Sequence, residues 1–219
     1  FGIYVFGIVM MFMNPHEPTA YIAPTIVGLG GAIGVIRYVL PDFVRNLKRG
    51  IFLTKRYVLI SISNLNYSIQ RSLLLFSLMT VAVTGMLAVL AANQNSPREF
   101  TTGVIGYIVV VVLLVVSIIY KLSMEALTRK TLFVNLWKIG YTRKELRKIV
   151  RQEVISYYFV LILIPLVYIM FISGRFIYYG DMSLQFAYIY ILSYIIPIIV
   201  SGFITYVQYI NAVVKPIKG

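Results

Sequence analysis

Few residues of the chain carry side chains suited to acid–base, nucleophilic or metal chemistry. Its 219 residues include no cysteine and one histidine, His16, which precedes Glu17 in the run NPHEP. Prolines on both sides of this pair are typical of a turn. A lone histidine without cysteines cannot build a zinc cluster or a thiol-dependent site. The sequence therefore predicts no catalytic residue, no metal site and no enzymatic activity in this chain.

One glycine-rich run invites comparison with a phosphate-binding loop. Residues Gly28–Gly34 read GLGGAIG. The phosphate loop of nucleotide-binding proteins needs a Lys and a Ser or Thr after its last glycine, and it follows a strand. This run has neither residue and lies inside an apolar stretch. No nucleotide site is expected in this chain.

The most informative pattern lies in the segment 121–153. Lys121–Lys138 is compatible with a helix, Gly140 is a helix stop, and Thr142 with Glu145 forms a capping box that starts a second helix. The second helix runs through Arg151 into the apolar run at Val154. A tight turn carried by two stiff helices could transmit force from a soluble partner. An ordinary basic loop with surface helices is the alternative, and these residues alone leave both open.

Composition shows which elements must position this turn. Hydrophobic residues make up 60% of the chain, charged residues 12%, and the mean hydropathy is +0.87. A soluble domain is about 45–50% apolar and about 25% charged, so we expect an all-α integral membrane protein. A spanning helix needs about 20 apolar residues. Five complete spans are expected: Tyr21–Leu40, Leu73–Ala92, Gly103–Tyr120, Val154–Ile172 and Phe186–Gln208.

The apolar run Phe1–Met13 is too short to span a bilayer. It is expected to be the end of a truncated sixth span, and the chain a piece of a longer polypeptide. A signal peptide is the alternative, but the basic n-region and the small-residue cleavage site of such a peptide are missing.

The distribution of Lys and Arg predicts the orientation. All basic residues except Arg98 and Arg175 lie in or beside segments 41–72, 121–153 and 209–219. Lys and Arg accumulate in cytoplasmic loops. These segments and the C-terminus are therefore expected on the cytoplasmic side of the plasma membrane. Asn14–Ala20, Asn93–Thr102 and Ser173–Gln185 are expected outside. The net charge of +13 then reflects orientation and contact with anionic lipids rather than nucleic acid. Segment 41–72 mixes basic and apolar residues and is expected to form an amphipathic helix on the inner leaflet.

The spans themselves carry little polar chemistry. None has an ionisable residue near its centre, which argues against an ion-coupled transporter or a channel. Six hydroxyl side chains are expected to bond their own helix backbones: Thr80, Thr84, Ser117, Ser193, Ser201 and Thr205. Pro165 and Pro197 would kink their helices or free a carbonyl. Tyrosines near span ends are expected to form an interfacial belt: Tyr107, Tyr120, Tyr157, Tyr158, Tyr178, Tyr179, Tyr188, Tyr206 and Tyr209.

Three runs together resemble a known family. They are Tyr120–Glu125 (YKLSME), Leu136–Lys148 (LWKIGYTRKELRK), and Gln152 with Glu153 entering a span. They resemble the FtsX-like permease family of ABC transporters, in particular the C-terminal half of the bacitracin-export type. The resemblance covers about residues 103–208. It implies preceding spans in 1–40, a cytoplasmic segment in 41–72 and the permease domain in 73–219.

The resemblance implies that this chain is the membrane subunit of a transporter whose dimeric cytoplasmic ATPase binds ATP and Mg. The permease would couple ATP hydrolysis to the handling or detection of antimicrobial peptides or lipid-linked substrates. Many members also signal to a membrane histidine kinase. The implied docking residues are Leu136, Lys138, Ile139, Gly140, Tyr141, Thr142, Arg143 and Lys144, with Thr142 and Glu145 as the cap.

One departure from the family is the short connection Asn93–Thr102, where members usually carry a large extracellular domain. Either this family member has no such domain, or the domain is missing from this sequence. A different class of function remains open beside transport. It is a non-transporting membrane scaffold or signalling protein that transmits force to a kinase or a cell-wall hydrolase.

Overall fold

The computed structural model describes residues 2–13, 26–27, 30–31, 33–39, 42, 46, 64–65, 67–93, 96–180 and 182–215. Within these residues all regular structure is helical. Two short π-helical segments are η1 (Val35–Val39) and η2 (Ile210–Val214). The α-helices are α1 (Gly2–Met13), α5 (Leu73–Ala92), α6 (Pro97–Thr128), α7 (Lys130–Lys138), α8 (Arg143–Tyr178) and α9 (Leu184–Tyr209).

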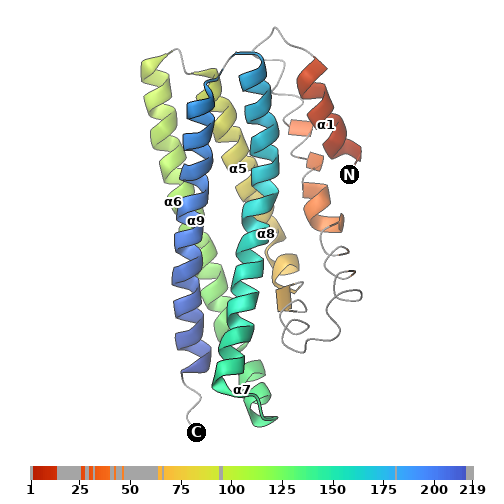
Figure 1. The fold of residues 1–219 in the computed structure, drawn as a ribbon, viewed down its shortest axis with the longest axis vertical. Helices are drawn as coiled ribbons and strands as arrows, with labels where there is room; N and C mark the ends of the chain where they lie inside the picture. Colours follow the sequence, from red (N-terminus) through yellow and green to blue (C-terminus); the bar gives the residue numbers. More distant parts are fainter. Residues whose placement is uncertain are drawn as a thin grey trace.

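Four long helices form the body of the molecule. α6 packs on α9, α9 on α8, α8 on α5, and α5 on α6, which closes a bundle whose helices run roughly side by side (Figure 1). The short α7 lies at one end of this bundle, together with the C-terminal end of α9 (Figure 1). We call this the α7 end. The N-terminal ends of α6 and α9 lie at the opposite end (Figure 1).

The four bundle helices are each long and apolar enough to cross a membrane. The expected span Leu73–Ala92 coincides with α5, and the expected spans 103–120, 154–172 and 186–208 lie inside α6, α8 and α9. The described residues confirm the all-α class, and the four bundle helices are consistent with a multi-pass membrane protein. The expected span at Tyr21–Leu40 and the amphipathic segment 41–72 fall largely outside the described residues. Gly2–Met13 forms α1, which contacts α8.

Several helix ends differ from the expected ones, because hydropathy detects only the apolar part of a helix. α6 begins at Pro97, and α8 continues to Tyr178, so both connections at that end are shorter than expected. The sequence predicts Ser173 and Arg175 in an outer loop, and this prediction is wrong, because both are buried inside α8. The expected helix Lys121–Lys138 is also interrupted. α6 ends at Thr128, and Arg129 separates it from α7.

The bundle helices carry many hydroxyl groups, and most bond within their own helix as expected. The side chains of Thr80, Thr84, Ser117, Ser193 and Ser201 donate to carbonyls three or four residues earlier. Thr205 instead pairs with the hydroxyl of Tyr158 at 2.8 Å. Such bonds satisfy hydroxyls that would otherwise be costly to bury.

The interfacial belt explains only part of the tyrosines. Tyr120, Tyr178 and Tyr188 are largely exposed, as a belt requires. The belt assignment is wrong for four others, which are buried between helices: Tyr107, Tyr157, Tyr158 and Tyr209. Tyrosine can be buried in this way because its ring fills apolar space while the hydroxyl finds a partner. Tyr107, for example, shares a hydrogen bond of 3.0 Å with Ser193.

Candidate functional site

The turn between α7 and α8 has a defined geometry that follows from its glycine. Gly140 has a φ of +100°, a conformation that residues with a Cβ rarely adopt. The N–H of Gly140 donates to the carbonyl of Trp137 at 3.0 Å, and the N–H of Tyr141 donates to that of Leu136 at 3.1 Å. These two bonds form a Schellman motif. The predicted helix stop at Gly140 is therefore confirmed.

The start of α8 is capped as its sequence predicts. The backbone N–H of Glu145 donates to the hydroxyl of Thr142, and the backbone N–H of Thr142 donates to the Glu145 carboxylate at 2.7 Å. Both halves of the capping box are thus present. Because the C-terminus of α7 and the N-terminus of α8 are both capped, the turn between them is held by hydrogen bonds on each side.

The structure brings the expected docking residues together at one exposed corner, residues 136–144, which we call the tip. Ile139 is 73% exposed and stands beside basic side chains. Leu136 and Tyr141 are half-buried and pack against the core. The others are exposed: Lys138, Gly140, Thr142, Arg143 and Lys144. The tip thus combines one exposed apolar side chain, Ile139, with the cations Lys138, Arg143 and Lys144, a surface suited to contact another protein.

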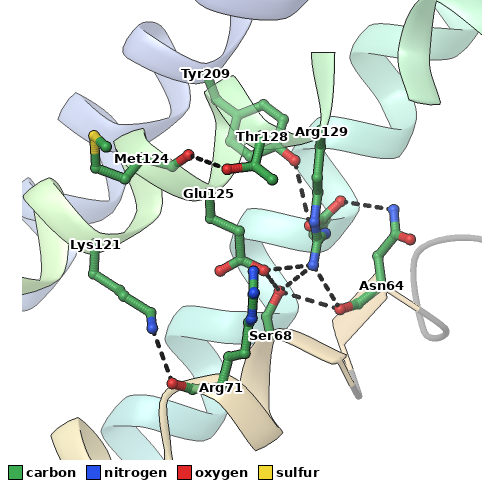
Figure 2. A network of polar contacts seen from close by, with 10 residues as sticks. Asn64, Ser68, Arg71, Lys121, Met124, Glu125, Thr128, Arg129 and Tyr209 are labelled. Carbon is green, nitrogen blue, oxygen red and sulfur yellow. Dashed lines mark hydrogen bonds and ion pairs between the residues drawn. The ribbon is translucent and has the colours of Figure 1, made fainter. Parts of the chain in front are cut away.

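A buried ionic cluster lies at the base of this helix pair. The guanidinium of Arg129 pairs with the carboxylates of Glu125 on α6 and Glu153 on α8. It also donates to the Ser68 hydroxyl at 2.8 Å and to the Asn64 carbonyl at 3.2 Å. Figure 2 shows these side chains converging from different parts of the chain. We call Asn64, Ser68, Glu125, Arg129, Glu153 and Tyr209 the Arg129 cluster.

Secondary bonds complete the cluster. Asn64 donates its side-chain amide to Glu153 at 3.1 Å, Ser68 donates to Glu125 at 2.7 Å, and the Tyr209 hydroxyl donates to Glu153 at 3.4 Å. These bonds matter because a buried charge is strongly unfavourable unless it is paired and hydrogen-bonded. The cluster therefore links the segment before α5 to α6, α8 and α9.

Burial and charge act in opposite directions on Arg129. Arg129, Glu125 and Glu153 are all less than 8% exposed. Burial alone would lower the pKa of Arg129, but the nearby carboxylates, that of Glu153 above all, outweigh it and raise its pKa above the ordinary value. Arg129 is therefore charged at any physiological pH.

Further contacts attach residues 67–71 to the same region. The guanidinium groups of Arg71 and Arg129 lie 5.1 and 5.3 Å from the ring centre of Tyr67. The ammonium group of Lys121 donates to the carbonyl of Arg71 at 2.9 Å (Figure 2). The end of α6 is thus tied to the segment that leads into α5.

The cluster has the character of a structural joint. Among the described residues, no group of three His, Cys, Asp or Glu side chains could hold a metal ion. The cluster is not predicted from the sequence: Glu125 and Glu153 enter there as parts of separate motifs, and no ion pair is assigned to either. The spacing of Glu125 and Arg129, four residues apart on one helix face, was a signal for half of it. Glu153 and Asn64 join through the tertiary fold, which no local spacing reveals.

Comparison with known proteins gave no match to any family model, any curated protein or any solved structure.

Proposed function

We propose that this protein is the membrane subunit of an ABC transporter of the FtsX-like permease type, and that the tip docks on its cytoplasmic ATPase. The supporting observation is the exposure of Ile139 among basic residues, on a turn capped from both sides. In this proposal the α7 end and the C-terminus face the cytoplasm, in agreement with the predicted concentration of Lys and Arg.

The helix that starts at the tip supports a mechanical role. α8 is continuous over 36 residues, from Arg143 in the tip to Tyr178 at the opposite end. At 1.5 Å per residue this helix is about 54 Å long, enough to cross the whole bilayer. A displacement of the tip would therefore move one rod through the membrane instead of being absorbed by a loop.

The Arg129 cluster supports the same role from the other helix of the pair. α7 joins α6 at Arg129, and the Arg129 side chain reaches across to Glu153 on α8. The two arms of the tip are thus tied to each other where they meet the bundle. We propose that this joint transmits motion of the ATPase to α6, α8 and the segment before α5 together.

The chemistry of the cycle belongs to the partner in this proposal. ATP and Mg bind the ATPase, and this chain converts ATP hydrolysis into movement of its helices. Antimicrobial peptides or lipid-linked substrates are the proposed cargo or signal, and a membrane histidine kinase is a further proposed partner. These assignments follow from the resemblance in sequence.

The test is the ATPase activity of the permease purified with its ATPase subunit. Ile139→Asp places an acidic group at the exposed centre of the tip and is expected to reduce both co-purification and stimulated ATPase activity. Thr131→Asp is the matched control, because it adds the same charge at an exposed position near the N-terminus of α7, where an acidic side chain is favourable. Equal loss in both variants, or in neither, would contradict the proposal.

A further inference from the structure

A groove of about 440 Å³ runs between α8 and α9, the two helices that lie side by side in Figure 1. Its volume falls in the range of sites for small ligands. Ile155 and Phe159 of α8 and Ile199 and Phe203 of α9 line it, and all four are more than half exposed. These four side chains form the two lips of the groove, and the groove opens on the outer surface of the bundle.

The floor of the groove depends on a glycine and a fixed tyrosine. A Cβ at Gly202 would lie 3.3 Å from the ring of Tyr158, so the missing side chain lets this ring lie against α9. The Tyr158 hydroxyl is turned away into α9, where it bonds Thr205 at 2.8 Å and accepts from Ser201 at 3.3 Å. Because the hydroxyl is hydrogen-bonded to α9, Tyr158 lines the groove with the apolar face of its ring.

The groove is apolar along its length and basic at one end. Arg151 lines it at the α7 end, one turn before Ile155 and two turns before Phe159 on the same face of α8. Arg147 lies one turn further along this face and is also exposed. A ligand that matches this pattern has an anionic head and a long apolar tail.

The length and the charge of the groove favour a lipid chain as the occupant. The groove extends from Arg151 to Ile162 of α8, about 16 Å of helix. One leaflet of the hydrocarbon core is about 15 Å thick, so the groove is about as long as one leaflet is thick. An acyl chain that lies along it brings the head of its lipid to Arg151.

We propose that this groove binds one acyl chain of an anionic phospholipid whose phosphate is held by Arg151. Anionic lipids are concentrated in the cytoplasmic leaflet, and the α7 end is the end predicted to face it. A bound lipid would cover the four exposed apolar side chains and fill the space left by Gly202. This site goes beyond the proposed function and does not require an ATPase partner.

The test uses phosphatidylglycerol with a photoreactive group on its acyl chain, as a minor component of phosphatidylcholine vesicles containing the chain. After illumination, the labelled residues are located by mass spectrometry. Labelling is expected to concentrate on the groove residues of α8 and α9. The reference is the exposed apolar face of α6, which includes Ile108 and Val112 and reports ordinary contact with bulk lipid.

Two pairs of variants separate the two ends of the proposed site. Ile155→Trp fills the groove and should abolish the preference for α8 and α9, whereas Ile108→Trp on α6 should leave it unchanged. Arg151→Gln should lower labelling of the groove by about fivefold, since one basic residue near the membrane surface contributes about that factor. Lys130→Gln, an exposed cation on α7, should have no effect.

Equal labelling of the groove and of α6 in the unaltered protein would overturn the proposal, because it would show bulk lipid only. Preferential labelling that survives Ile155→Trp would also overturn it. A further experiment places a photoreactive residue at position 159 and illuminates native membranes. Its cross-linking to a protein instead of a lipid would show that another chain covers the groove.

Discussion

The hydroxyl of Tyr194 on α9 donates a hydrogen bond of 3.1 Å to the carbonyl oxygen of Leu161 on α8. Leu161 lies four residues before Pro165, and proline has no N–H to complete the helical bond to that carbonyl. The tyrosine of one helix thus satisfies a group that the proline of its neighbour leaves free. This bond joins α8 and α9 in the apolar part of the bundle. In the hydrocarbon core of a bilayer, no water can bond a carbonyl that is left free.

Tyr194→Phe should therefore lower the free energy of unfolding by about 1 kcal/mol. In a Pro165→Ala background the helix regains an N–H for Leu161, so the same change should cost less than half as much. Reversible unfolding in mixed detergent micelles measures both values. Tyr190→Phe is the control, because the Tyr190 hydroxyl bonds Val83 on α5 and does not involve Pro165. An identical cost of Tyr194→Phe in both backgrounds would contradict this role.

The Arg129 cluster makes a second prediction for stability. Arg129→Met removes the guanidinium that pairs with two buried carboxylates and should cost about 3–5 kcal/mol. Arg147→Met is the matched control on the exposed face of α8 and should change stability by less than about 0.5 kcal/mol. Thermal unfolding in detergent compares the two variants.

Restoring the charge balance should reverse part of that loss. Adding Glu125→Leu and Glu153→Leu to Arg129→Met leaves no unpaired charge in the cluster, so the triple variant should be more stable than Arg129→Met alone. A triple variant less stable than Arg129→Met would contradict this, because it would show that the two carboxylates stabilise the fold without Arg129.

The positive φ of Gly140 makes a third prediction, for the tip itself. Gly140→Val forces a β-branched residue into a left-handed conformation and should weaken the turn by about 1–2 kcal/mol. Amide hydrogen exchange at Tyr141, whose N–H bonds Leu136, should then accelerate by about tenfold. Gly140→Asn should have a much smaller effect, because asparagine tolerates this conformation. Equal exchange in the two variants would show that the turn does not require the glycine.

The parts of the fold that can be predicted from the sequence are those that depend on local composition or on residues close together in the chain. Hydropathy predicted α5 from Leu73 to Ala92 at its observed ends, because polar residues flank that helix closely. For α6 and α8 it found only the central part, because these helices continue past the apolar region as amphipathic segments. The turn at Gly140 and the cap at Thr142 were predictable because both depend on residues within a few positions of each other.

The parts that escaped prediction depend on contacts between distant residues. Tyr158 and Tyr209 were assigned to an interface by their positions near span ends, yet the packing of α8 against α9 buries both. Tyr190, Tyr194, Ser201 and Thr205 follow one another at spacings of four or seven residues along α9, and all four are buried. That polar periodicity was a readable sign of an inward face. Arg129 meeting Glu153 left no comparable sign.

Docking of a cytoplasmic protein on the tip is tested most directly by thiol labelling. Because the chain contains no cysteine, Ile139→Cys supplies a single reactive thiol at the tip, and Thr131→Cys supplies a comparison on α7, which ends just before Ile139. A membrane-impermeant maleimide should label both in inside-out vesicles stripped of peripheral proteins. In unstripped vesicles only the thiol at position 139 should be protected. Labelling of position 139 from the outside, or at the same rate with and without peripheral proteins, would contradict a cytoplasmic docking tip.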